Sequence, residues 1–152
     1  MSSVIQNSQK PFPFYLPLLL SAVIIVLYLI PLIVMTLKGK GSGAGIWGLF
    51  SIVALLITII APVVYGWKTR DTKGAALVGV LPFLFVMTIP RVLSGELPRT
   101  TELLVDAVLY IVSLCAIGGL EGYFASLHEK KSLVVAIALA GLWIVFFLSG
   151  IN

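Results

Sequence analysis

The chain has 152 residues, of which 60% are hydrophobic and only 11% are charged, and its mean hydropathy is +1.15. Soluble domains carry a charge on roughly a quarter of their residues, so this composition excludes a soluble protein and predicts a polytopic membrane protein. The net charge of +4 comes from short basic loops, which favour contact with lipid headgroups and not with nucleic acid.

The apolar residues form five membrane-length runs, and no polar block between them is long enough to fold separately. The predicted spans are 14–37, 45–67, 74–92, 102–127 and 132–151. We therefore expect an all-α fold: a polytopic integral membrane protein with five transmembrane helices in an up-down helical bundle. Residues 1–152 would form a single transmembrane domain.

The first span is too long for the core of a signal peptide and is not followed by a small-residue cleavage site. We interpret it as a retained span, with a kink at Pro31, where proline removes an interior hydrogen bond. The glycine-rich turn 38–44 that follows lacks the spacing of a phosphate-binding loop.

The loop 68–73 is basic and so short that the second and third spans must be antiparallel neighbours. Ala75 and Gly79 in the third span form a pair of small residues one helical turn apart, which lets another backbone approach closely. Arg91, where this span ends, has two interpretations. It either extends to the membrane interface or pairs with a carboxylate of the next helix, and Asp106 is the first candidate.

The fourth span carries two carboxylates, Asp106 near one end and Glu121 near the other. Thr100 or Thr101 is the predicted helix cap. An ionisable group in hydrocarbon costs a few kcal/mol and usually faces protein or water. We therefore expect protein or internal water to shield both carboxylates from lipid, and we expect the two residues to mark the functional surface of the protein.

A helical wheel at about 100° per residue places the carboxylates in a stripe roughly 80° wide, together with Tyr110 and Ser113. Gly118 and Gly122 lie on the opposite side and form a second small-residue packing pair. The helical rise separates the two carboxylates by about 22 Å, so they cannot touch each other within one helix.

The fifth span follows a tight hairpin, contains the small residues Ala136 and Ala140 and carries no charge. Five spans place the termini on opposite sides of the membrane. Six of the Lys and Arg residues fall on the side of the N-terminus and four on the other side. The positive-inside rule therefore predicts a multi-pass protein with a cytoplasmic N-terminus and the C-terminus across the membrane.

The sequence does not favour an enzyme. It has one Cys, Cys115, and one His, His128, and their spacing fits neither a metal site nor a cofactor site, so we predict no metal and no cofactor. The usual motifs of lipid-modifying, di-iron and hydrolytic membrane enzymes do not occur either.

Three functions stay open. The leading hypothesis is an accessory or scaffold subunit of a membrane complex or homo-oligomer, whose partners are the lipid bilayer and other membrane subunits or copies of itself. One alternative is a small transporter or channel that uses Asp106 and Glu121 as proton or cation sites. The other is an intramembrane enzyme that acts on a lipid or quinone.

Overall fold

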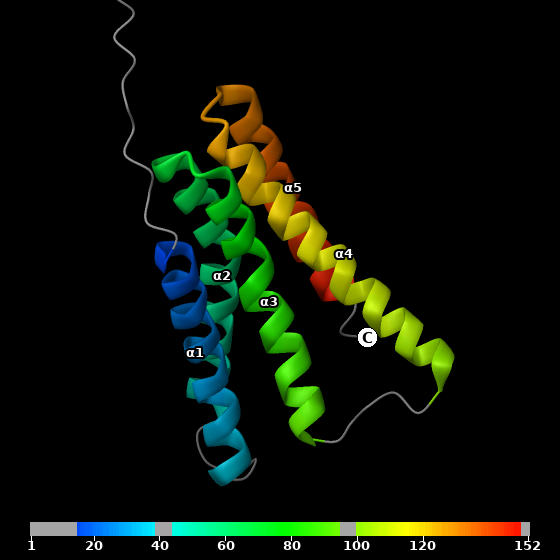
Figure 1. The fold of residues 1–152 in the computed structure, drawn as a ribbon. Coiled ribbons are helices and arrows are strands. Elements are labelled where there is room, and N and C mark those ends of the chain that lie inside the picture. Colours follow the sequence, from blue (N-terminus) through cyan, green and yellow to red (C-terminus); the bar gives the residue numbers. More distant parts are fainter. Residues whose placement is uncertain (1–14, 39–43, 95–99, 150–152) are drawn as a thin grey trace, which may run out of the picture.

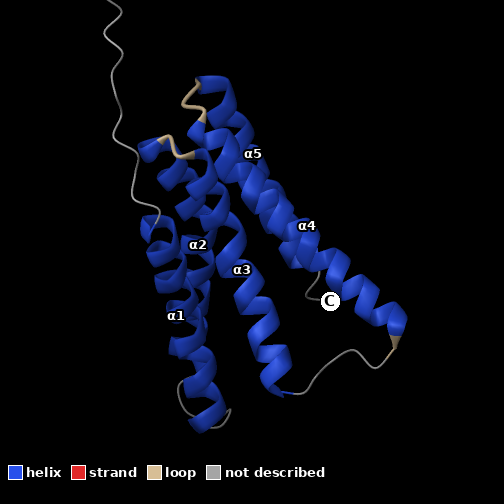
Figure 2. Ribbon diagram, viewed as in Figure 1, coloured by secondary structure: helices blue, strands red, loops and turns tan. Residues whose placement is uncertain are grey.

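The computed structural model describes residues 15–38, 44–94 and 100–149. Within these ranges the secondary structure is entirely helical (Figures 1 and 2). The helices are α1 (Tyr15–Lys38), α2 (Ala44–Thr69), α3 (Thr72–Ser94), α4 (Thr101–Ser126) and α5 (Lys130–Ser149). The all-α prediction is therefore confirmed for the described residues, and every predicted boundary lies within two residues of the observed one.

Four of the described helices are long and apolar enough to cross a membrane. The four stretches are Leu49–Thr69, Thr72–Ile89, Thr101–Ser126 and Lys130–Ser149. In α1 the stretch found among the described residues is Tyr15–Pro31, which is shorter than the other four. Membrane insertion of the bundle is thus supported by four helices, and the fifth span stays a prediction.

A two-residue turn joins α2 to α3 and holds them as neighbours. Arg70 adopts a left-handed conformation with φ 54°, which ends α2. Asp71 then caps α3, since the Gly74 amide donates to its Oδ1 at 3.0 Å and the Tyr65 hydroxyl donates to its Oδ2 at 3.1 Å. Both carboxylate oxygens of Asp71 are thereby used to fix the turn.

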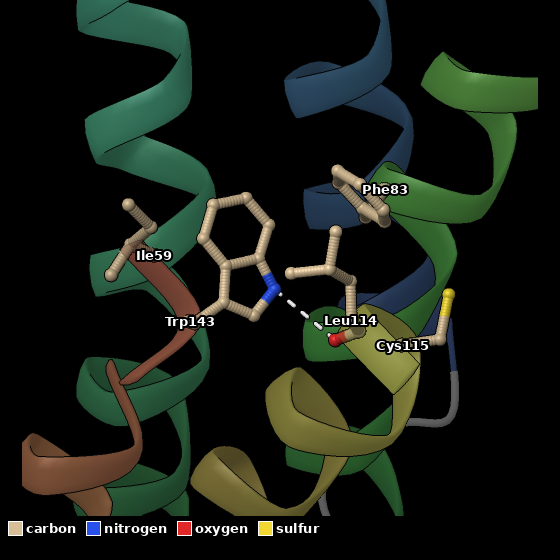
Figure 3. Close-up of a cluster of buried hydrophobic side chains, with 5 residues drawn as sticks. All are labelled: Ile59, Phe83, Leu114, Cys115 and Trp143. Carbon is tan, nitrogen blue, oxygen red and sulfur yellow. Dashed lines mark hydrogen bonds between the residues drawn. The ribbon is translucent and has the colours of Figure 1, made fainter. Parts of the chain in front are cut away.

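The main core lies where α2, α3, α4 and α5 meet, and Figure 3 shows its five buried side chains: Ile59, Phe83, Leu114, Cys115 and Trp143. Trp143 is only 2% exposed, and its Nε1 donates to the Leu114 carbonyl at 3.1 Å. Its ring meets the Phe83 ring edge-on, with centroids 5.1 Å apart. The indole therefore fastens α5 to α4 and α3 with its polar atom satisfied.

A second cluster fastens α1 to the rest of the bundle. It consists of Ile24 from α1, Tyr65 from α2, and Ala75 and Val78 from α3, all of which are buried. α1 accordingly packs against α2 and α3.

Between α3 and α4 the contact is made by backbone atoms. Gly79 touches the backbone of Gly118, and Gly122 touches the backbone of Ala75. A Cβ atom at Gly66 of α2 would lie 2.7 Å from the Gly122 carbonyl oxygen and 3.1 Å from the Ala75 Cβ atom. We call this meeting of α2, α3 and α4 the glycine crossing. Residues without bulky side chains allow three helices to approach here, as is common in membranes.

Toward its N-terminal end, α4 leaves this crossing and leans away from α3 (Figure 1). All side chains from Thr101 to Asp106 are exposed. Thr100 caps this end, as predicted, by accepting a hydrogen bond from the Leu103 amide at 3.4 Å. The regular up-down bundle is not confirmed, because α3 and α4 meet closely near one end and diverge toward the other.

The glycine crossing predicts which glycines tolerate a methyl group. A Cβ at Gly118 would lie 2.5 Å from the Gly79 carbonyl oxygen, whereas one at Gly141 meets nothing within 4 Å. We expect Gly118→Ala to destabilise the fold by about 1–3 kcal/mol, because the helix backbones must separate. Gly141→Ala should be neutral or stabilising by up to about 1 kcal/mol, because alanine is the better helix former.

Thermal unfolding in detergent of the two matched variants measures the difference. Equal melting temperatures for Gly118→Ala and Gly141→Ala would show that the helices are not in backbone contact.

Candidate functional site

Glu121 lies inside the bundle at the level of the glycine crossing. Its side chain is 1% exposed, and its Oε1 atom has no hydrogen-bond partner among the residues that the structure describes. The next residue, Gly122, is the one that touches Ala75 of α3 and approaches Gly66 of α2. The carboxyl group is therefore enclosed by the chain's own helices.

Such a position is energetically costly. A buried polar atom without a partner costs about 1–3 kcal/mol, and an unpaired charge costs more. A carboxylate here needs a proton, a cation or water as its partner, which is the chemistry of an ion or proton site. Glu121 is therefore the strongest candidate functional residue in the described part of the chain.

Asp106 has a different environment, although it lies on the same helix. Its side chain is exposed and lines a shallow hollow of about 250 Å³ with Thr101, Glu102 and Val105. The two carboxylates thus do not form one sheltered surface: Glu121 is covered by protein and Asp106 is open to its surroundings.

The other residues of the predicted polar stripe also have separate roles. The Tyr110 hydroxyl donates to the Phe147 carbonyl of α5 at 3.0 Å, and its ring stacks on Phe146 with centroids 6.0 Å apart. Ser113 is half-buried. Tyr110 therefore joins α4 to α5, which a wheel of α4 alone cannot reveal.

Arg91 lies near the end of α3, and its side chain is outside the described residues. Its pairing with Asp106 therefore stays a prediction. The divergence of α3 from α4 toward this end (Figure 1) separates the two backbones in the observed conformation.

The predicted packing residues lie at helix contacts. Gly118, Gly122, Ala75 and Gly79 form most of the glycine crossing. In α5, Ala136 is fully buried and Ala140 packs beside the main core.

Sequence reasoning missed one contact that joins the two basic turns. The His128 Nδ1 atom donates to the Trp67 carbonyl oxygen at 3.1 Å, and the two rings stack with centroids 4.1 Å apart. His128 has φ 57°, which turns the chain from α4 toward α5. Nothing in the sequence links residues that lie 61 positions apart. By contrast, the cap at Asp71 follows a common sequence preference and was detectable.

Among the residues that the structure describes, no group of three or more His, Cys, Asp or Glu side chains is placed to hold a metal ion. Fold and site together define an all-helical protein with membrane-length apolar helices and a buried carboxyl group at a helix crossing. No known family matches the chain, and no curated protein or solved structure is significantly similar to it.

The missing partner of Glu121 predicts an unusual stability effect. Glu121→Met keeps the length of the side chain but removes both oxygens, so no buried polar atom is left unsatisfied. We expect this variant to unfold at the same or a higher temperature than the wild type in detergent. Asp106→Asn, at an exposed position on the same helix, should leave the melting temperature unchanged.

A loss of more than about 2 kcal/mol in Glu121→Met would contradict this expectation, since losses of that size follow removal of one member of a satisfied buried pair.

Proposed function

We propose that this chain moves protons or small cations across a membrane and that Glu121 is the residue that carries them. The observation behind the proposal is the complete burial of this carboxyl group without a partner for Oε1 among the described residues. Ionisable groups inside membrane helices are rare and commonly lie on ion or proton pathways.

Transport requires the carboxyl group to meet water first on one side of the membrane and then on the other. In the described conformation Glu121 is closed off, so the helices around it must move. The glycine crossing suits such a movement because its closest contacts are between backbones, and packed helices move past one another by small shear displacements.

The register of the crossing suggests what the movement brings together. Ala75 meets Gly122, and Gly79 meets Gly118. A residue four positions later on α3 therefore contacts a residue four positions earlier on α4. Continued along both helices, this register places Arg91 opposite Asp106. We propose that α4 pivots at the crossing. When the diverging ends of α3 and α4 close, the Arg91–Asp106 pair forms. At the other end of α4, Glu121 then becomes accessible.

The flux test uses the protein reconstituted in liposomes that contain a dye sensitive to the cation under test, with proton, Na⁺ and K⁺ gradients imposed in turn. We expect Glu121→Gln to reduce flux at least tenfold, because the amide cannot exchange a proton or balance a cation. Glu102→Gln is the matched control on the same helix and should retain flux. Asp106→Asn should slow flux severalfold, since it removes only the closing pair.

Wild-type flux that Glu121→Gln leaves intact would overturn the proposal, as would the absence of flux for all three cations.

We propose a subunit role as the second function, and the exposed first half of α4 favours it. Thr101 to Asp106 are all exposed, and Asp106 lies in the second turn of a helix long enough to span a membrane. A neighbouring membrane chain that brought a cation to Asp106 would remove the cost of leaving this charge against lipid. No observation on the described residues favours the enzyme hypothesis in the same way.

This second function predicts a partner whose binding depends on Asp106. A second membrane protein should co-purify in mild detergent at a constant ratio, and Asp106→Lys should abolish its recovery because the charges then repel. Glu102→Gln should preserve it. Recovery of the same chains with Asp106→Lys would exclude contact at this position.

The orientation is proposed from charge. Five described cations gather at the end of the bundle that holds both basic turns (Figure 1). They are Lys68, Arg70, Lys73, Lys130 and Lys131. The positive-inside rule favours the cytoplasm for this end, and with it a cytoplasmic N-terminus.

A further inference from the structure

An apolar groove of about 470 Å³ runs along α2 beside Leu20 of α1. Its floor includes a stripe of α2 side chains spaced three or four residues apart, all of them exposed: Val53, Leu56, Ile60, Val64 and Lys68. Four of these residues are aliphatic, and the last, at the end of the helix, is a cation. The groove therefore changes from apolar to positively charged along its length.

The groove is long enough to line the full depth of one leaflet of a bilayer. From Val53 to Lys68 the helix rises by about 22 Å at 1.5 Å per residue. Half of the hydrocarbon core of a bilayer measures about 15 Å. With Lys68 at the headgroup level, an acyl chain lying along the stripe stays within the groove over the full depth of its leaflet.

The polar end of the groove is selective for charge. The Tyr65 hydroxyl is already used on Asp71, and the Thr69 hydroxyl donates to the Tyr65 carbonyl. Lys68 is exposed, and it makes no ion pair with another described residue. The available group is therefore an ammonium, which attracts an anion and offers little to a neutral headgroup.

The surrounding charges reinforce this preference. Arg70 and Lys73 belong to the same turn and are both exposed. The acidic groups at this end are Asp71, whose oxygens cap α3 and bind Tyr65, and Glu129, which precedes α5. A cluster of basic residues at the membrane surface is worth about 1 kcal/mol per cation toward anionic lipid.

We propose that this groove binds one anionic phospholipid, with an acyl chain along the aliphatic stripe and the phosphate at Lys68. An apolar surface that is at least as long as one leaflet is deep and that ends in a cation is complementary to this ligand in both shape and charge. Bound in this way, the lipid would cover the outer face of α2 and contact Leu20 of α1.

The test is native mass spectrometry of the purified full chain, titrated with phosphatidylglycerol and with phosphatidylcholine of the same acyl chains. We expect the wild type to bind one phosphatidylglycerol molecule more tightly than phosphatidylcholine. Lys68→Gln should weaken phosphatidylglycerol binding about fivefold, the loss of one surface cation, and should leave phosphatidylcholine binding unchanged. Lys131→Gln, an exposed cation at the same end but on α5, is the matched control and should change neither.

A second variant tests the apolar part of the groove. Ile60 is 54% exposed, so Ile60→Trp should fold normally, fill the groove and weaken the binding of both lipids. The proposal is overturned if the two lipids bind the wild type equally, if Lys131→Gln weakens binding as much as Lys68→Gln, or if Ile60→Trp binds like the wild type.

Discussion

The approach of three helix backbones at Gly66, Gly79, Gly118 and Gly122 is the constraint on which the rest of this structure depends. In a bilayer, apolar side chains gain nothing by leaving lipid for protein, so helix association relies on close van der Waals contact and on polar groups. Glycines make that contact possible here. They also set the height at which α4 crosses α2 and α3, which places Glu121 inside the bundle.

The two carboxylates of α4 show that helix packing determines whether a charged side chain is buried or exposed. Glu121 is covered because it lies at the level where α4 is enclosed by other helices, whereas Asp106 is open because the helix has already diverged from α3 there (Figure 1). Both lie about five residues from an end of α4. Their environments differ because of the neighbouring helices, and not because of their positions along α4.

Helix boundaries and small-residue contacts could be predicted from the sequence because both depend on local properties. Apolar length fixed each predicted span, the hydroxyl of Thr100 predicted the cap of α4, and the spacing of Gly118 and Gly122 identified a face that a neighbour could approach. The predicted polar stripe does not form a single surface in the structure. A helical wheel gives the directions of side chains on one helix, and it contains no information about where neighbouring helices diverge. The groove along α2 was also beyond sequence reasoning, since the sequence does not place Leu20 of α1 beside it.

The carboxyl group without a partner lies beside the glycine contact, so it destabilises a part of the bundle that this contact otherwise holds together. The main core is held by Trp143, whose polar atom is satisfied and whose ring contacts the rings of Phe83 and Phe147. At the glycine crossing, Ala75 packs against the buried Tyr65, but the crossing also contains the buried Glu121, whose Oε1 atom has no partner among the described residues. Segments that open first in a protein are those with the lowest local stability. The unsatisfied carboxyl group of Glu121 therefore lowers the local stability of the crossing, whereas the core around Trp143 keeps α4 joined to α5 and α3.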